Sequence, residues 1–443
     1  MSLDPDKLAR ALARMAGGAS LHLSNIVRLS GGANMESWSF DWGGAGYVLR
    51  RAPSALMMAD RPFGHDVEAA LVRAAHAGGV RAPEVVGELH ADDDLGTGYV
   101  MKRIEADVAP AKILADPPPR LIHDLAREMA RIHAIAPRAD IAIPVMDTAE
   151  ALAELKTRFM AYGGDRPIIA LALRWCEDNL PPPAAPRLVH GDLRMGNVMV
   201  APDGLAAVLD WELAHWGDPH EDLAYGCMTV WRFGNIDKPA FGLADLDTYF
   251  AAYEAESGTR VDPARFRFWL VYRTLWWALG CIQMSDIWRT GADRTLERAV
   301  IGRRTSENEL DLLLLLESDA PAAEQTRVTL PAPVPARRQG ESSTVELLEA
   351  IREWIDSDVK ARAEGRDKFM AAVAMNALGM LIREQENPLD PHDKALSDAI
   401  LAGTATLATP GLLARLRTMA LGKLANDVPK YAALKAAHQA WTA

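Results

Sequence analysis

The stretch LVHGDLRMGNVMV at residues 188–200 is closely followed by VLDWELAHWGDPHEDLA at residues 208–224. In each stretch a short apolar run, which predicts a strand, leads into a group of polar side chains. The polar residues in question are His190, Asp192, Asn197 and Asp210. Hydrophobic burial does not require such side chains at a strand end, so they are candidates for chemistry carried on loops.

Phosphoryl transfer from a nucleotide uses residues of these types in this order. The reaction needs metal ions on the phosphates and a carboxylate that orients and deprotonates the acceptor hydroxyl. In protein kinases a base Asp and a metal-binding Asn share one loop, and a metal-binding Asp begins the next loop. HGDLRMGN followed by LDWE has this order. The alternative interpretation is a set of solvated turn residues, because Asp, Asn and Gly favour turns, but turn propensity does not explain the order and spacing.

The sequence resembles the aminoglycoside phosphotransferase-like family of small-molecule kinases over about residues 20–315. The segments GYVLRRAP, GYVMKRI, HGDLRMGN and LDWELAHWGDPHEDLA together resemble the kinase-like portion of certain acyl-CoA dehydrogenase fusion proteins. The resemblance implies an α+β, bilobal protein-kinase-like fold, with a small antiparallel β-sheet in the N-terminal lobe and a mostly helical C-terminal lobe. It also implies ATP and Mg²⁺ as cofactors and a small-molecule hydroxyl as the acceptor.

Each residue of the motif takes a role from this resemblance. Asp192 is the expected catalytic base, and His190 is expected to brace the same loop rather than to do acid–base work. Asn197 is expected to bind magnesium, and Asp210 to be the main magnesium ligand, bridging the phosphates. Asp222 is expected to tie the helical lobe together rather than to touch substrate.

A glycine-rich stretch, SGGANMES at residues 30–37, lies between two expected strands. Glycines let a backbone approach phosphates closely, so Gly31 and Gly32 are expected in a loop that covers the nucleotide. Asn34 and Ser37 would donate hydrogen bonds there. An ordinary hairpin turn is the alternative interpretation, and the downstream motif favours the nucleotide-binding one.

The strand YVLRRAP departs from the usual kinase-like pattern. A Lys usually contacts the α and β phosphates at this place, whereas here Arg50 is expected to do so, with Arg51 left open. Arginine is always charged and can bind phosphate bidentately, so the electrostatic role is kept. Glu68, on the following helix, is the candidate ion-pair partner, the alternative being a solvated helix residue.

The pattern of residues 1–105 predicts a β-rich lobe, and the resemblance implies that this lobe binds the nucleotide. An amphipathic helix is expected over residues 1–20, followed by strands at NIVRLS, ESWSFDW and GYVLRRA, the helix FGHDVEAALVRAAHAGG, and strands at PEVVGELH and GTGYVMKRI. From Leu121 to about Leu316 most segments have helical periodicity, which predicts a helical lobe over residues 106–318. The resemblance implies that this lobe contains the catalytic loop.

A Pro- and Ala-rich stretch at residues 319–341 predicts a linker. Beyond it Ser343 and Glu346 form a capping-box pattern that predicts a helix start, and the helical domain is expected to span residues 342–443. Its two apolar faces, VELLEAIREWI and FMAAVAMNALGMLI, would pack on each other, dock on the kinase lobes or form a homodimer.

Composition limits the partners and the compartment. The net charge of −12 disfavours nucleic-acid binding, and no local basic patch compensates for it. The run Leu312 to Leu316 is too short to span a bilayer, which needs roughly 20 apolar residues, so no membrane partner is expected. Three widely spaced cysteines and the lack of a secretory signal pattern at the N-terminus predict a cytoplasmic protein.

The leading hypothesis is an ATP- and Mg²⁺-dependent kinase that phosphorylates a hydroxyl of a small metabolite, with a hydroxyacyl-CoA as the first candidate acceptor. An aminoglycoside or amino-alcohol kinase, and a catalytically silent nucleotide-binding module, are the alternatives. Aromatic and arginine side chains at residues 230–234 and 265–289 would either form core or line an acceptor pocket whose arginines meet an anionic substrate.

Overall fold

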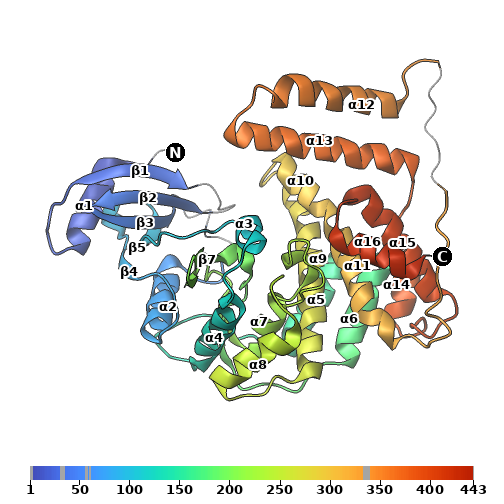
Figure 1. The fold of residues 1–443 in the computed structure, drawn as a ribbon, viewed down its shortest axis with the longest axis horizontal. Helices are drawn as coiled ribbons and strands as arrows, with labels where there is room; N and C mark the ends of the chain where they lie inside the picture. The colour runs from blue at the N-terminus through green and yellow to red at the C-terminus, as the bar shows by residue number, and fades with distance from the viewer. Residues whose placement is uncertain (1–2, 30–34, 55–57, 59–60, 333–339, 443) are drawn as a thin grey trace. The chain divides into compact units, whose positions relative to one another are not determined.

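The computed structural model describes residues 3–29, 35–54, 58, 61–332 and 340–442 (Figure 1). The chain forms two compact units. The first comprises Met1–Asp147, Pro182–Phe233 and Asp237–Phe266. The second comprises Thr148–Pro181, Gly234–Ile236 and Arg267–Ala443.

A five-stranded antiparallel sheet begins the first unit, as the sequence predicts. Its strands lie in the order β1 (Leu23–Leu29), β2 (Glu36–Trp42), β3 (Ala45–Ala52), β5 (Thr97–Lys102) and β4 (Val85–Glu88). Gly43 and Gly44 form the turn between β2 and β3 with φ values of 61° and 84°. A two-residue hairpin of this kind needs positive φ at both positions, which glycine adopts without strain.

Two helices cover this sheet. Helix α1 (Pro5–Met15) starts at Asp4, whose carboxylate accepts hydrogen bonds from the backbone of Asp6 and Lys7. Its apolar residues Leu8 and Leu12 form one hydrophobic cluster with Phe40, Leu49 and Val100 of the sheet. Helix α2 (His65–Ala77) packs on β4 and β5 (Figure 1). Burial of these apolar faces fixes where the polar ends of β3 and α2 lie.

The rest of the first unit carries the motif loops. It contains helices α3 (Pro110–Ala115), α4 (Leu121–Ala134), α7 (Pro219–Tyr225) and α8 (Leu246–Ser257), together with two short antiparallel sheets of two strands each. One pairs β6 (Arg187–Val189) with β9 (His215–Gly217), and the other pairs β7 (Val198–Ala201) with β8 (Gly204–Val208). The two quoted motifs therefore lie on the loops from β6 to β7 and from β8 to β9.

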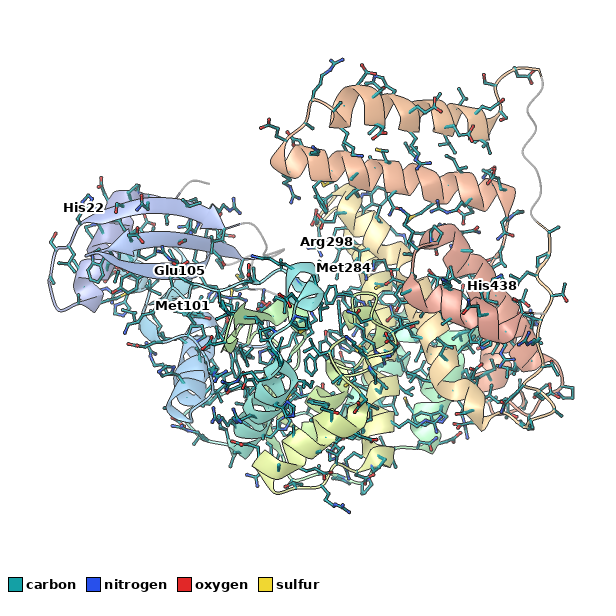
Figure 2. All side chains as sticks on the ribbon, in the orientation of Figure 1. His22, Met101, Glu105, Met284, Arg298 and His438 are labelled. Atoms are coloured by element: carbon teal, nitrogen blue, oxygen red, sulfur yellow. The ribbon has the colours of Figure 1, made fainter. Side chains whose placement is uncertain are left out.

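The second unit is helical. Its elements are α5 (Thr148–Ala161), α6 (Pro167–Asp178), α9 (Pro263–Thr290) from Arg267 onward, α10 (Leu296–Arg303), α11 (Thr305–Leu316), α12 (Thr344–Trp354), α13 (Gly365–Glu386), α14 (Lys394–Leu401), α15 (Leu412–Asp427) and α16 (Ala432–Trp441). Figure 2 shows Met284 of α9 beside Arg298 of α10, whose Nη1 donates to the methionine sulfur at 2.9 Å. The predicted capping box is confirmed, since Ser343 and Glu346 bond reciprocally at the start of α12.

Helix α11 is buried in spite of its many charged residues. Glu307, Glu309 and Asp311 are each at most 4 % exposed. The partners of Glu309 and Asp311 come from elsewhere in the chain: Arg166 forms a bidentate pair with Glu309, and Tyr431 Oη donates to Asp311 Oδ2 at 2.6 Å. Because a buried carboxylate is costly without donors, α6 and the segment before α16 are required to hold α11.

The Pro- and Ala-rich stretch contacts the C-terminal helices at Thr326 and Val328. Arg417 of α15 donates to the carbonyl of Thr326 at 2.7 Å and to Glu317 at 2.6 Å, and its guanidinium stacks on Trp441. The backbone N–H of Val328 donates a hydrogen bond to the carbonyl of Trp441. None of the helices within the described ranges is long and apolar enough to cross a membrane.

Replacing Arg417 tests whether these contacts stabilise the second unit. Because its side chain is 6 % exposed and holds a carboxylate and a carbonyl, Arg417→Ala is expected to lower the free energy of unfolding by about 2 to 3 kcal/mol. Arg415→Ala on the same helix removes a pair from an arginine that is 55 % exposed, and should cost about 0.5 kcal/mol or less. Urea unfolding measures both, and equal losses would contradict the assignment.

Candidate active site

The loop from β6 to β7 depends on a glycine at its centre. Gly191 has φ = 80°, and a Cβ atom there would lie 2.4 Å from the carbonyl oxygen of Leu213. A side chain at this position would therefore force apart the loops that carry Asp192 and Asp210. This steric limit explains why the motif has glycine between His190 and Asp192.

Asp222 of α7 anchors the same loop. Its carboxylate is fully buried and accepts hydrogen bonds from the backbone N–H groups of His190 at 2.6 Å and Gly191 at 2.8 Å. His133 of α4 lies 3.3 Å from the carboxylate. Although burial acts to raise the pKa of Asp222, the contact with His133 and the backbone N–H of His190 hold that pKa below its ordinary value. Asp222 thus ties the loop to α4 and α7.

His190 is bonded to the main chain through both ring nitrogens. Nδ1 accepts from the backbone N–H of Asp192 at 3.2 Å, so Nε2 carries the proton and donates to the carbonyl of Leu209 at 3.1 Å. Burial lowers the pKa of His190. The ring also lies 4.6 Å from that of Trp211. A neutral histidine with both nitrogens committed connects the two motif loops.

Asp192 and Asn197 lie together on the loop from β6 to β7. The amide nitrogen of Asn197 donates to Asp192 Oδ2 at 2.6 Å and to the Asp192 carbonyl at 2.8 Å. With its nitrogen committed in this way, Asn197 keeps its amide oxygen for another group, and no described residue donates to that oxygen. The arrangement fixes the carboxylate of Asp192 and leaves an oxygen ligand beside it.

Arg50 joins the sheet to the second motif loop. Its Nη2 donates to Asp210 Oδ1 at 2.7 Å and to Glu212 Oε2 at 2.6 Å, and its Nε lies 3.2 Å from Glu68 Oε1. Asp210 has φ = 66°, a left-handed conformation that Asp tolerates better than most residues. Although burial opposes the charge of Arg50, Glu68 and Asp210 raise its pKa.

Arg51 has a different environment from Arg50, because neighbouring residues of a strand point to opposite faces. It is 4 % exposed and pairs with Glu36 at 2.8 Å. Ser37 lies opposite Arg50 in the register of β2 with β3 and therefore shares its face of the sheet. Gly31, Gly32 and Asn34 lie outside the described residues.

Three charged residues of the site were not singled out by the sequence. Glu212 belongs to the quoted DWE triplet but was given no role, and it contacts Arg50 and Arg61. Arg61 stands before α2 in a segment without a recognisable motif. Arg194, in HGDLR, donates from Nε to Asp192 Oδ1 at 3.0 Å. Glu212 meets Arg50 across 162 residues, which sequence spacing does not report, whereas Arg194 lies two residues from Asp192 within the motif.

The pKa values show the electrostatic field at this place. Burial, followed by the charges of Arg50 and Arg61, lowers the pKa of His65 to about 4. Burial and the neighbouring charge of Asp210 raise the pKa of Glu212 to about 6. Positive and negative groups lie in direct contact here, since Arg50 bonds to Asp210 and Glu212, and groups of both signs suit a metal–phosphate ligand.

The donor set fits a magnesium ion. Mg²⁺ prefers oxygen ligands and is usually held by one or two carboxylates together with substrate phosphates and water. The carboxylate of Asp210 and the amide oxygen of Asn197 supply ligands of this kind. Across the described residues no group of three or more His, Cys, Asp or Glu side chains is arranged to hold a metal. Ligands beyond these two would come from nucleotide phosphates and water, as is usual for Mg²⁺.

The aromatic and arginine side chains divide into core and paired groups. Trp269 is fully buried, and Arg273 stacks on Trp276. Arg265 pairs with Asp218, and Arg267 pairs with Asp319. These arginines already have partners within the chain, so they give no support to an anionic acceptor.

Comparison with known proteins places this geometry in context. The family model of the phosphotransferase enzyme family matches residues 25–269. Acyl-CoA dehydrogenase family member 10 of Mus musculus is 24% identical over 284 residues, which are 57% of this chain and 26% of that protein. Acyl-CoA dehydrogenase family member 11 of Gallus gallus is 27% identical over 247 residues, 49% of this chain and 31% of that protein. The chain thus spans about a quarter to a third of these curated relatives.

A solved structure shows the same fold. A Ralstonia eutropha JMP134 protein assigned as an aminoglycoside phosphotransferase is 20% identical, with a TM-score of 0.58, and the match covers 72% of this chain and 99% of that one. The kinase-like fold expected from the sequence is therefore confirmed. The match leaves part of this chain uncovered, in line with an additional helical region.

Asp222→Asn tests how the loop from β6 to β7 is held. An amide offers one acceptor oxygen in place of two, so a backbone N–H of His190 or Gly191 loses its partner and the free energy of unfolding should fall by about 2 to 3 kcal/mol. Amide hydrogen exchange should accelerate at these two residues. Asp245→Asn, at the start of α8, is the control, because Asn is an equally good helix cap.

The loss should also depend on pH. Because the folded pKa of Asp222 lies below its ordinary 3.8, its contribution is complete above about pH 4 and disappears as the pH falls through the folded pKa. The gap between wild type and Asp222→Asn should narrow there. Unchanged exchange at both amides would contradict the anchoring role.

Proposed function

Because the chain belongs to the phosphotransferase enzyme family, we propose that it transfers the γ-phosphate of ATP to a hydroxyl group of a small metabolite. The observation that carries this proposal is the arrangement of four side chains in one compact unit. Asn197 holds Asp192, and Arg50 holds Asp210, with each contact at 2.6 to 2.7 Å. A base and an amide oxygen on one loop, and an arginine and a carboxylate beside them, supply the groups that phosphoryl transfer requires.

In the proposed reaction the acceptor hydroxyl attacks the γ-phosphorus. The new phosphorus–oxygen bond forms as the bond to the leaving ADP oxygen breaks, and the hydroxyl proton passes to Asp192. Arg50 would meet the phosphates and offset the charge that develops on them. Magnesium, held by Asp210 and Asn197, would supply neutralisation of the phosphate oxygens.

The proposed acceptor is a hydroxyacyl-CoA. Two relatives bear the name of acyl-CoA dehydrogenase family members, so an acyl thioester that carries a hydroxyl is a fitting substrate class for this chain. An aminoglycoside or amino-alcohol acceptor is the competing class, and the Ralstonia structure carries an aminoglycoside assignment. A catalytically silent module is less well supported, because the base and both magnesium-ligand candidates are present.

Transfer of labelled γ-phosphate from ATP to a panel of acceptors tests the activity. Hydroxyacyl-CoAs, amino alcohols, sugars and aminoglycosides would be compared, with Asp192→Asn as the control. We expect label on a hydroxyacyl-CoA and a loss of at least 100-fold in the variant, because the base is removed while the loop is kept. If MgATP binds but no acceptor is labelled, the silent module is the better description.

The neighbouring arginines of β3 provide a matched pair for nucleotide binding. Arg50→Gln should weaken MgATP binding about 10- to 100-fold, because a bidentate donor to phosphate is lost. Arg51→Gln should lower thermal stability through the loss of its buried pair with Glu36, yet leave the affinity within about 2-fold. Isothermal titration calorimetry on the folded variants measures both affinities, and an equal effect would refute the assignment of Arg50.

A further inference from the structure

Arg194 is fixed beside the proposed base by two contacts. Its Nε donates to Asp192 Oδ1 at 3.0 Å, and its guanidinium carbon lies 4.4 Å from the ring centre of Trp231. The side chain is 24 % exposed. A guanidinium that is hydrogen-bonded on one edge and stacked on an indole has little rotational freedom, so the direction of its other N–H groups is set.

Most of the hydrogen-bonding capacity of Arg194 is unused. Guanidinium has five N–H donors, and the one on Nε is taken by Asp192. No described residue accepts a hydrogen bond from either of its Nη atoms. These atoms are also not among the fully buried polar atoms that lack a partner, so a ligand can reach them. The loop therefore presents four donors to a ligand next to the base.

The charge of Arg194 acts on both parts of the proposed site. Although burial opposes its charge, Asp192 raises the pKa of Arg194, and Asp210 contributes as well. The guanidinium thus lies in electrostatic range of the base on one loop and of the proposed metal ligand on the other. Phosphoryl transfer must happen between these two groups.

The geometry of transfer determines which anion approaches these donors. An acceptor oxygen has to lie about 2.6 to 3.2 Å from the base, and the phosphorus about 3 to 3.5 Å from that oxygen. The phosphoryl oxygens then come within reach of a guanidinium that is itself bonded to the base. Asp192 is negatively charged, and so is the arriving phosphoryl group, so a cation at this point offsets their repulsion.

We propose that Arg194 is a catalytic residue that binds the phosphoryl group during its passage from nucleotide to acceptor, while its Nε holds Asp192 in place. The proposal rests on the kinase function proposed above. Trp231 is then a positioning residue, because its indole ring holds the guanidinium in plane. The alternative anion for the Nη donors of Arg194 is an acidic group of the acceptor.

Orthovanadate with MgADP tests the proposal without any acceptor. Vanadate imitates the phosphoryl group in transfer, and analogues of a transition state bind far more tightly than ground-state ligands. In wild type we expect vanadate to tighten MgADP binding, measured by displacement of a fluorescent ADP. In Arg194→Gln this tightening should fall about 10- to 100-fold, because charge-assisted hydrogen bonds are lost, while MgADP alone should bind within about 2-fold of wild type.

Three further variants separate binding from structure. Arg194→Lys keeps the charge and should retain part of the tightening, and Trp231→Leu should lose part of it although the arginine remains. Arg187→Gln, at the exposed start of β6, is the control and should bind like wild type. Thermal unfolding of each variant confirms that the protein is folded.

The outcomes are distinct. If vanadate tightens MgADP binding in Arg194→Gln as much as in wild type, the proposal is overturned. Arg194 then only positions Asp192 or binds an acidic group of the acceptor. Absence of tightening in wild type that still binds MgADP also overturns it. Absence of MgADP binding by wild type overturns the kinase function itself.

Discussion

A carboxylate that leaves water must be met by a cation or by hydrogen-bond donors, and this constraint governs both units of the chain. Removal of a carboxylate from water costs several kcal/mol unless it is compensated. Asp222 is compensated by two backbone amides and a histidine, Glu68 by Arg50, and Glu309 by Arg166. Each of these pairings joins segments that are distant in the sequence, so the same contacts that neutralise charge also fix the fold.

At the proposed active site the constraint brings the working groups together. Arg50 is matched to Asp210 and Glu212 at the same time as to Glu68. On the proposed function, a magnesium nucleotide brings both a cation for the carboxylates and an anion for the arginine. Before binding, Arg50 and the carboxylates neutralise one another; after binding, the phosphates would neutralise Arg50 and magnesium would neutralise the carboxylates. No buried charge is then left without a partner in either state.

In the helical unit the same constraint explains why a charged helix is found in the interior. The sequence of α11 places Glu307, Glu309 and Asp311 before a run of leucines, and all three are buried. Tyr431 and Arg166 provide donors, and both lie outside α11 and its immediate neighbours. The segment after residue 342 therefore contributes to the interior of this unit. The domain boundaries expected at residues 105, 318 and 341 stay predictions.

The sequence by itself determined the local elements and the order of the motif. Alternation predicted the strands of the sheet, periodicity predicted α2 and α4, and Ser343 with Glu346 predicted the start of α12, because these signals arise from neighbours along the chain. The order of Asp192, Asn197 and Asp210 matched that of the kinase loops, and the resemblance that this motif supports implied a kinase-like fold.

Only the tertiary structure decided which side chains meet. The sequence favoured Arg50 and left Arg51 open, and the two faces of β3 separate their contacts: Arg50 pairs with Asp210, and Arg51 pairs with Glu36. Arg61 and Glu212 acquired partners in the same way. The physical reason is that electrostatic contacts depend on distances in space across many residues, whereas a sequence pattern reports only the repeat along the chain.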